Sequence, residues 1–207
     1  SSRLNIDEVL DIESMRPTGE RHKAMVPDTL DLVDQMEYSV NILTNSLDPS
    51  HAYAVGSIQY DKKPEIYYPN WDISPKNARQ LPMLRQAVGT DHNLDIEYNL
   101  MKTLLKAIDE DGQLYYPVTA SKLKGTSYPQ TNATTIFAML NFKARDGNPK
   151  WDDWIDHLAR GIRNVAIHVE DRAFFPMQAG IDRQGKWTVQ DGQGNPDYIP
   201  EVEPHMD

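Results

Sequence analysis

The sequence has no cysteine among its 207 residues, and it is poor in positive charge. Without cysteine the chain can form neither a disulfide nor a cysteine-based zinc site, and it has no thiol nucleophile. Lysine and arginine number 21 against 31 aspartates and glutamates, so the formal net charge is −10. Because a nucleic-acid-binding surface needs clustered basic residues to neutralise phosphates, we expect no nucleic-acid partner.

Long apolar runs are also missing from the sequence. No stretch approaches the roughly 20 apolar residues of a membrane helix, so we expect no membrane partner. The first residues, Ser1 to Leu4, lead into charged residues rather than into the apolar segment of a signal peptide. The sequence leaves the cellular compartment open. Its length suffices for one domain with a hydrophobic core, or for part of a larger protein.

Apolar residues that recur every three or four positions predict five helices. Ser74 and Asn132 are the expected N-caps of the second and fourth helices, because a short polar side chain can accept a hydrogen bond from a free amide of the first turn. Gly89 is the expected C-cap of the second helix. The five predicted helices cover approximately residues 30–47, 74–88, 93–111, 133–144 and 150–169.

Two stretches, each at the end of a predicted helix, resemble each other. Residues 111–117 read Asp-Gly-Gln-Leu-Tyr-Tyr-Pro, and residues 170–176 read Glu-Asp-Arg-Ala-Phe-Phe-Pro. Both place an acid, a turn, two aromatic residues and a proline in the same order. Because such repeats are typical of stacked supersecondary units, we expect two helical hairpins of somewhat under 60 residues. Two unrelated antiparallel helix pairs are the alternative interpretation.

The first of these turns, together with the Gly-Asn-Pro-Lys-Trp sequence at 147–151, resembles six-hairpin glycosidases, which fold as (α/α) toroids. The resemblance covers roughly residues 27–180. It implies an all-α fold of repeated helical hairpins with long loops, and a small β-hairpin follows near the C-terminus. A complete toroid has twelve helices, whereas this chain supplies about five. The resemblance therefore implies a partial toroid that is completed by further chain or by a second subunit.

The chain divides accordingly into three parts. Residues 1–26 are interpreted as an N-terminal arm, residues 27–180 as the helical-hairpin domain, and residues 181–207 as a small hairpin with an extended tail. The hairpin is indicated by a Gly-containing turn between two short strand-like runs.

The resemblance implies a carbohydrate ligand and glycoside hydrolase activity. Hydrolysis of a glycosidic bond generally needs two carboxyl groups, one as acid and one as base or nucleophile. Asp111 and Glu170 hold equivalent positions after two helices, and Asp72 follows Trp71 in a long connection. These three acids are the candidate catalytic residues. Each also fits the commoner role of a cap, a turn residue or a solvated acid.

Aromatic side chains on the predicted loops are candidates for stacking on sugar rings. The alternative is that they pack the loops against the helices, because aromatic rings usually bury most of their surface. His168, near a helix end, is a candidate for binding or proton transfer. The candidate substrate-binding residues are Trp71, Tyr67, Tyr68, Tyr115, Tyr116, Tyr128 and His168.

No pattern in the sequence indicates a metal or a cofactor. His157 and His168 are too far apart for a metal-binding pair on one helical face, and no Gly-rich phosphate loop is present. We therefore expect neither. Two other functions remain open beside hydrolysis. One is a non-catalytic saccharide-binding or assembly module, and the other is a polysaccharide lyase, which would favour tyrosine and histidine over paired carboxyls.

Overall fold

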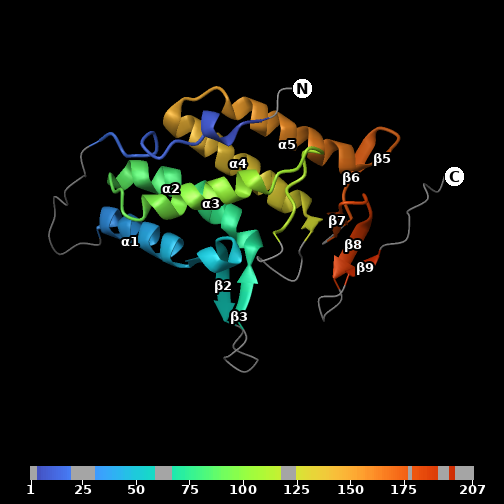
Figure 1. The fold of residues 1–207 in the computed structure, drawn as a ribbon, viewed down its shortest axis with the longest axis horizontal. Helices are drawn as coiled ribbons and strands as arrows, with labels where there is room; N and C mark the ends of the chain where they lie inside the picture. The colour runs from blue at the N-terminus through green and yellow to red at the C-terminus, as the bar shows by residue number, and fades with distance from the viewer. Residues whose placement is uncertain are drawn as a thin grey trace.

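The structure is a computed structural model, and it describes residues 4–19, 31–58, 67–117, 125–176, 179–190 and 196–198. Within these ranges the chain forms five α-helices and several small sheets (Figure 1). No helix in this part of the chain is long and apolar enough to cross a bilayer. The α-helices are α1 (Leu32–Asn45), α2 (Ser74–Val88), α3 (Leu94–Lys106), α4 (Pro129–Asp146) and α5 (Trp151–Val165). The 3-10 helices are η1 (Ile6–Glu8), η2 (Pro49–His51) and η3 (Trp71–Ile73).

The prediction of an all-α partial toroid is wrong, because antiparallel sheets lie between and beside the helices. Strands of two to five residues leave too short an alternation of apolar and polar residues to be read from sequence. The predicted C-terminal hairpin is confirmed by the antiparallel pairing of β7 (Gly180–Asp182) with β8 (Trp187–Gln190). One sheet has the order β1 (Leu47–Asp48), β2 (Ala54–Ile58) and β3 (Tyr67–Asn70). A second has the order β4 (Thr126–Ser127), β7 (Gly180–Asp182), β8 (Trp187–Gln190) and β9 (Pro196–Tyr198), and a third pairs β5 (Ile167–Val169) with β6 (Arg172–Phe174).

The two similar turns of the sequence have different structures. In the first, Tyr115 and Tyr116 are buried, with 4% and 3% of their surface exposed. In the second, the residues form the β5–β6 hairpin, where Phe174 and Phe175 are 42% and 39% exposed. The likeness between these stretches therefore reflects composition and not a repeated structural unit.

Both predicted N-caps are wrong, because each side chain bonds to backbone from a distant part of the chain. Ser74 begins α2, but its Oγ donates to the carbonyl of Tyr53 at 2.7 Å. Asn132 lies inside α4, where its Oδ1 accepts a hydrogen bond from the amide of Leu114 at 2.8 Å. The C-cap prediction at Gly89 is confirmed, and its φ of 67° suits glycine.

Helices α2 and α4 lie side by side and run in the same direction. Near their N-terminal ends, Thr131 Oγ1 of α4 donates to Asp72 Oδ1, just before α2, at 3.0 Å. Near their C-terminal ends, Arg85 of α2 and Arg145 of α4 both bind the carboxylate of Glu97 on α3. Helix α1 contacts α2 on the side away from α4, and α5 packs on α4 (Figure 1). This layer of helices positions the loops at its two ends.

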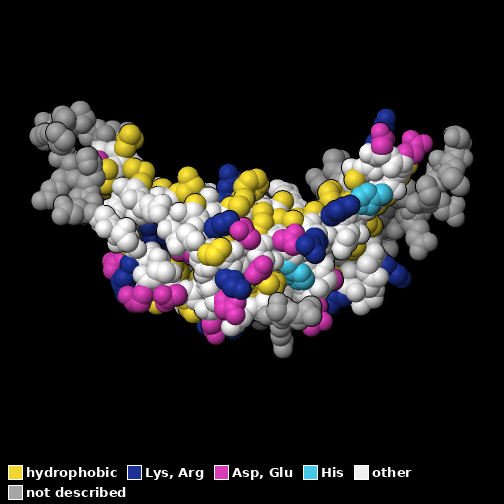
Figure 2. Space-filling view, turned by 90° about the horizontal axis from the view of Figure 1, so that it is seen from above, with side chains coloured by type: hydrophobic (Ala, Val, Ile, Leu, Met, Phe, Trp, Pro, Cys, Tyr) yellow, Lys and Arg dark blue, Asp and Glu magenta, His cyan; other side chains and the backbone are white. Residues whose placement is uncertain are grey.

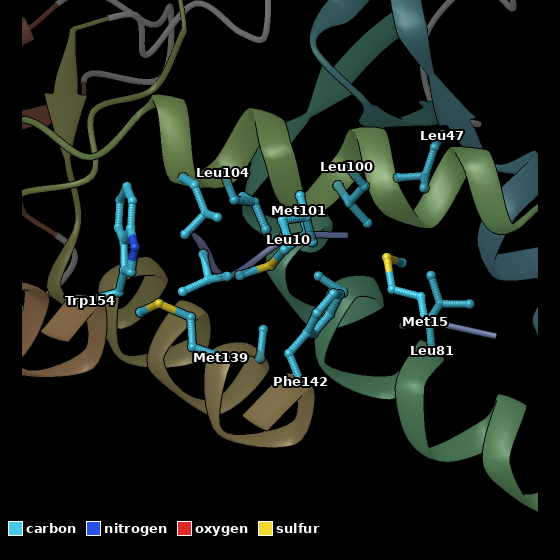
Figure 3. Packing of buried hydrophobic residues seen from close by; sticks show 14 of the residues in the cluster. Leu10, Met15, Leu47, Leu81, Leu100, Met101, Leu104, Met139, Phe142 and Trp154 are labelled. Carbon is cyan, nitrogen blue, oxygen red and sulfur yellow. The ribbon is translucent and has the colours of Figure 1, made fainter. Parts of the chain in front are cut away.

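The hydrophobic core includes the N-terminal residues 4–19 as well as the helices. Figure 3 shows Leu10 and Met15 among the side chains of α2, α3 and α4. Leu10 is 4% exposed and Met15 is 1% exposed. The Nδ2 of Asn148, which follows α4, donates to the carbonyl of Glu8 at 2.7 Å and so ties the segment to the end of α4. The N-terminal segment is therefore part of the packed interior.

Hydrophobic side chains also reach the surface on α2 and α4. Met83 is 60% exposed, Phe137 51% and Leu140 41%. The guanidinium carbon of Arg79 lies 4.9 Å from the centre of the Phe137 ring. Figure 2 shows hydrophobic side chains along the concave edge of the molecule, with acidic and basic side chains mainly below it. The sequence-based prediction that further chain or a second subunit covers an apolar face of the helices stays a prediction.

Candidate functional site

The candidate residues from the sequence lie in three places in the fold. One group surrounds the N-terminal ends of α2 and α4, a second follows the end of α3, and a third is on the β5–β6 hairpin. Tyr67 and Tyr68 belong to β3, and their side chains lie outside the described part of the structure.

Asp72 stands where two parallel helices begin. One of its carboxylate oxygens accepts from Lys76 Nζ at 2.7 Å, and the other accepts from Thr131 Oγ1 at 3.0 Å. The Tyr116 phenol lies 2.9 Å from the same threonine oxygen. Since the only hydroxyl proton of Thr131 points to Asp72, the phenol donates to Thr131. The N-terminal ends of α2 and α4 stabilise the carboxylate that closes this chain of hydrogen bonds.

The aromatic candidates of this first group pack against one another. Trp71 is fully buried and donates from Nε1 to the carbonyl of Ala52 at 2.9 Å. Its ring centre lies 5.0 Å from that of Tyr116, which lies 5.3 Å from that of Tyr128. Burial raises the pKa of Tyr116 and of Tyr128 above the ordinary value. This geometry fits the interpretation in which the rings hold the loops against the helices.

The Asp111 side chain, in the second group, is hydrogen-bonded within the turn to which it belongs. Its Oδ1 accepts from the amide of Gln113 at 2.9 Å, and its Oδ2 accepts from the Tyr115 hydroxyl at 2.7 Å. The guanidinium of Arg183 covers the Tyr115 ring, with 4.4 Å from its carbon to the ring centre. Burial and the hydrogen bond to Asp111 raise the pKa of Tyr115, so this phenol stays protonated near neutral pH and is a poor base.

Two glycines allow the same turn to pack closely against α5. Gly112 has a φ of 75°, and Gly161 of α5 lies against it. A Cβ atom built on Gly161 would lie 2.8 Å from Gly112 Cα and closer still to its carbonyl group. His157, one turn earlier on α5, places Nε2 2.9 Å from the carbonyl oxygen of Asp109. The end of α3 is therefore held firmly on α5.

Two adjoining hollows open beside this turn. The first has a volume of about 430 Å³ and lies between the end of α3, the segment 115–117 and Arg183. The second, of about 700 Å³, lies between the N-terminal segment, α3 and Trp154 of α5. Both are in the size range of small-molecule sites. They share Lys106 and Ile108, so they meet at the last turn of α3.

None of the three candidate catalytic acids lines either hollow. The acid that lines the first is Asp109. The amide of Glu110 donates to its Oδ1 at 2.8 Å and, together with the Arg183 guanidinium, holds the pKa of this carboxyl below its ordinary value. Asp109 is therefore ionised near neutral pH, which does not suit a general acid.

The third group is exposed and stands apart from both hollows. Glu170 occupies the turn of the β5–β6 hairpin, with a φ of 54°. His168 is exposed, and its Nε2 lies 3.1 Å from the carbonyl oxygen of Arg163 at the end of α5. Neither residue lines the hollows at the end of α3.

Comparisons with known proteins add no relative: no family model, no curated protein and no solved structure matches this chain. In the part of the chain that the structure describes, no group of three or more histidines, aspartates or glutamates is placed to hold a metal ion. An assignment of function therefore has to rest on the chain's own side chains.

Reasoning from sequence missed three residues of the hollows: Lys106, Trp154 and Arg183. Lys106 lies in the last turn of α3, where the sequence indicates only a favourable interaction with the helix dipole. Trp154 belongs to the apolar stripe of α5, and this pattern predicts a core residue. In the structure it is 5% exposed. Arg183 lies in the β7–β8 turn, and only the tertiary fold brings it to Tyr115.

Proposed function

We propose that this chain is a saccharide-binding protein whose ligand occupies the two adjoining hollows at the end of α3. The observation that carries the proposal is the composition of their walls. Tyr115 lines one hollow and Trp154 the other, and Thr103 and Asn5 add hydrogen-bonding groups. Sites for small ligands combine apolar surface with a few polar groups in this way. The resemblance to six-hairpin glycosidases in sequence favours a sugar as the ligand.

The positions of the acids favour binding over hydrolysis. A hydrolase needs two carboxyls on opposite sides of the bond that is cleaved. Asp111 is engaged by its own turn, and Glu170 lies on an exposed hairpin. A lyase is disfavoured too, because the raised pKa of Tyr115 opposes its use as a base.

Hydrolysis is the second candidate, and Asp72 is the observation in its favour. This carboxylate is half-buried at the beginning of two helices and is linked through Thr131 to the phenol of Tyr116. Such a buried hydrogen-bonded network holds a carboxylate in a fixed position, as catalysis requires. Release of reducing ends from an oligosaccharide, abolished in Asp72→Asn, would decide for this candidate.

Blocking the first hollow tests the binding proposal. Thr103 lines it, and a Thr103→Trp variant would fill it, so we expect loss of saccharide binding in isothermal titration calorimetry against a panel of oligosaccharides. Thr134→Trp is the matched control, because both threonines donate to the carbonyl four residues earlier, at 2.8 and 2.9 Å, and Thr134 lines neither hollow. Wild-type protein that binds no saccharide, or undiminished binding by Thr103→Trp, would overturn the proposal.

A further inference from the structure

Lys106 stands on the border between the two hollows. It is one of the two residues that line both, and its side chain is exposed. Its ammonium group forms no hydrogen bond or ion pair with any residue that the structure describes. A ligand that extends across both hollows would therefore lie beside the Lys106 ammonium group, whose N–H donors are available for hydrogen bonds.

Positive charge is in excess along these walls. Lys102, Lys106 and Arg183 line the hollows, against the two carboxylates Asp7 and Asp109. Asp109 and Arg183 pair with each other, which leaves Lys102 and Lys106 against Asp7. The excess contrasts with the chain as a whole, whose formal net charge is −10. A local excess of positive charge on an acidic protein favours an anionic ligand over a neutral one.

The two lysines also repel each other. Lys102 and Lys106 are four residues apart on α3, so they lie on the same face one turn from each other. Lys102 is held by Tyr98, with 3.3 Å from Nζ to the hydroxyl and 5.2 Å to the ring centre. An anionic group placed beside Lys106 would offset this repulsion.

We propose that the ligand is an acidic saccharide, with a uronate carboxylate on Lys106 and sugar rings in the hollows on either side. This inference rests on the proposed function and names the chemical class of its ligand. An ammonium–carboxylate hydrogen bond is stronger than a neutral one, so the carboxylate sets the preference while the hollows accept the rings.

Methyl esters provide a matched neutral probe for the experiment. Trisaccharides of galacturonate, glucuronate and mannuronate are compared with their fully methyl-esterified forms by isothermal titration calorimetry, at low and at high salt. We expect at least one acid to bind about tenfold more tightly than its ester. The preference should shrink as salt rises, because the site is open to solvent. Lys106→Met should abolish the preference, so that each acid and its ester bind this variant with equal affinity.

Two variants separate a role of charge from a structural one. Lys106→Arg keeps the charge and should keep most of the preference. Lys143→Met removes a half-buried lysine that pairs with Asp152 and lines neither hollow, and it should leave the preference for the acid unchanged. Equal affinity for acids and esters would overturn the acidic-ligand inference and leave saccharide binding standing. Absence of binding by these probes and by the neutral panel would overturn saccharide binding itself.

Discussion

At the scale of single residues, the contact between Gly112 and Gly161 decides how closely the turn after α3 approaches α5. At an exposed helical position, replacing glycine with alanine stabilises a protein by about 1 kcal/mol. Here the added Cβ would meet the backbone of Gly112, so we expect Gly161→Ala to lower the free energy of unfolding by about 1–3 kcal/mol. Urea denaturation measures the change.

Gly19→Ala is the control for this substitution, because no heavy atom of the described residues, beyond its chain neighbours, lies within 4 Å of a Cβ placed there. Its effect should stay within about 0.5 kcal/mol. A gain in stability for Gly161→Ala would contradict the close contact between α5 and the turn.

Single residues also mark the limit of what the sequence predicts. Asn132 and Ser74 were expected to cap helices, and both do bond to backbone groups. Their partners are the amide of Leu114 and the carbonyl of Tyr53, which lie 18 and 21 residues away. The chemistry of a short polar side chain could be read from sequence, but a partner supplied by another part of the fold could not.

At the scale of helices and strands, Glu97 of α3 joins α2 to α4. Its carboxylate binds Arg85 and Arg145, and all three side chains are at most 4% exposed. We expect Glu97→Gln to lower the free energy of unfolding by about 3–5 kcal/mol, because it leaves two buried guanidinium groups without a carboxylate. Chemical denaturation monitored by circular dichroism measures the loss.

The exposed pair Asp156–Arg160 on α5 provides the control, with side chains 57% and 73% exposed. Asp156→Asn should cost less than about 1 kcal/mol, because solvent screens such pairs. A loss in Glu97→Gln no larger than that of the control would argue against a structural role for the buried cluster.

Helices were easier to predict than strands for a physical reason. A helix of 13 to 18 residues repeats its apolar face several times, and α2 and α5 begin within a residue of where the pattern places them. The strand β3 has four residues and β5 has three, so neither completes a readable alternation. The candidate site could not be predicted for the same reason. Arg183 reaches Tyr115 only because the sheet that contains β7 and β8 brings their turn to it.

At the scale of the whole molecule, sequence similarity between two turns suggested a stack of equal hairpins. The structure instead buries Tyr116 in the interior and exposes Phe175 on a hairpin. The interior is completed by the N-terminal segment, and not by a further hairpin of the described chain, because Leu10 and Met15 fill the space between α2, α3 and α4 (Figure 3). The order of apolar and polar residues in that segment gave no sign of this, since it lacks a regular period.

Met15→Ala tests whether the N-terminal segment folds together with the helices. Met15 is 1% exposed, so its truncation leaves a cavity that should lower the free energy of unfolding by about 2–5 kcal/mol. Leu32→Ala, at a position 67% exposed on α1, should change it by less than about 0.5 kcal/mol. If the segment were an independent attachment, Met15→Ala would leave the urea midpoint unchanged and would speed hydrogen exchange only within residues 4–19. A parallel loss of protection in α3 and α4 is expected, because a core shared by all these parts opens in one cooperative step.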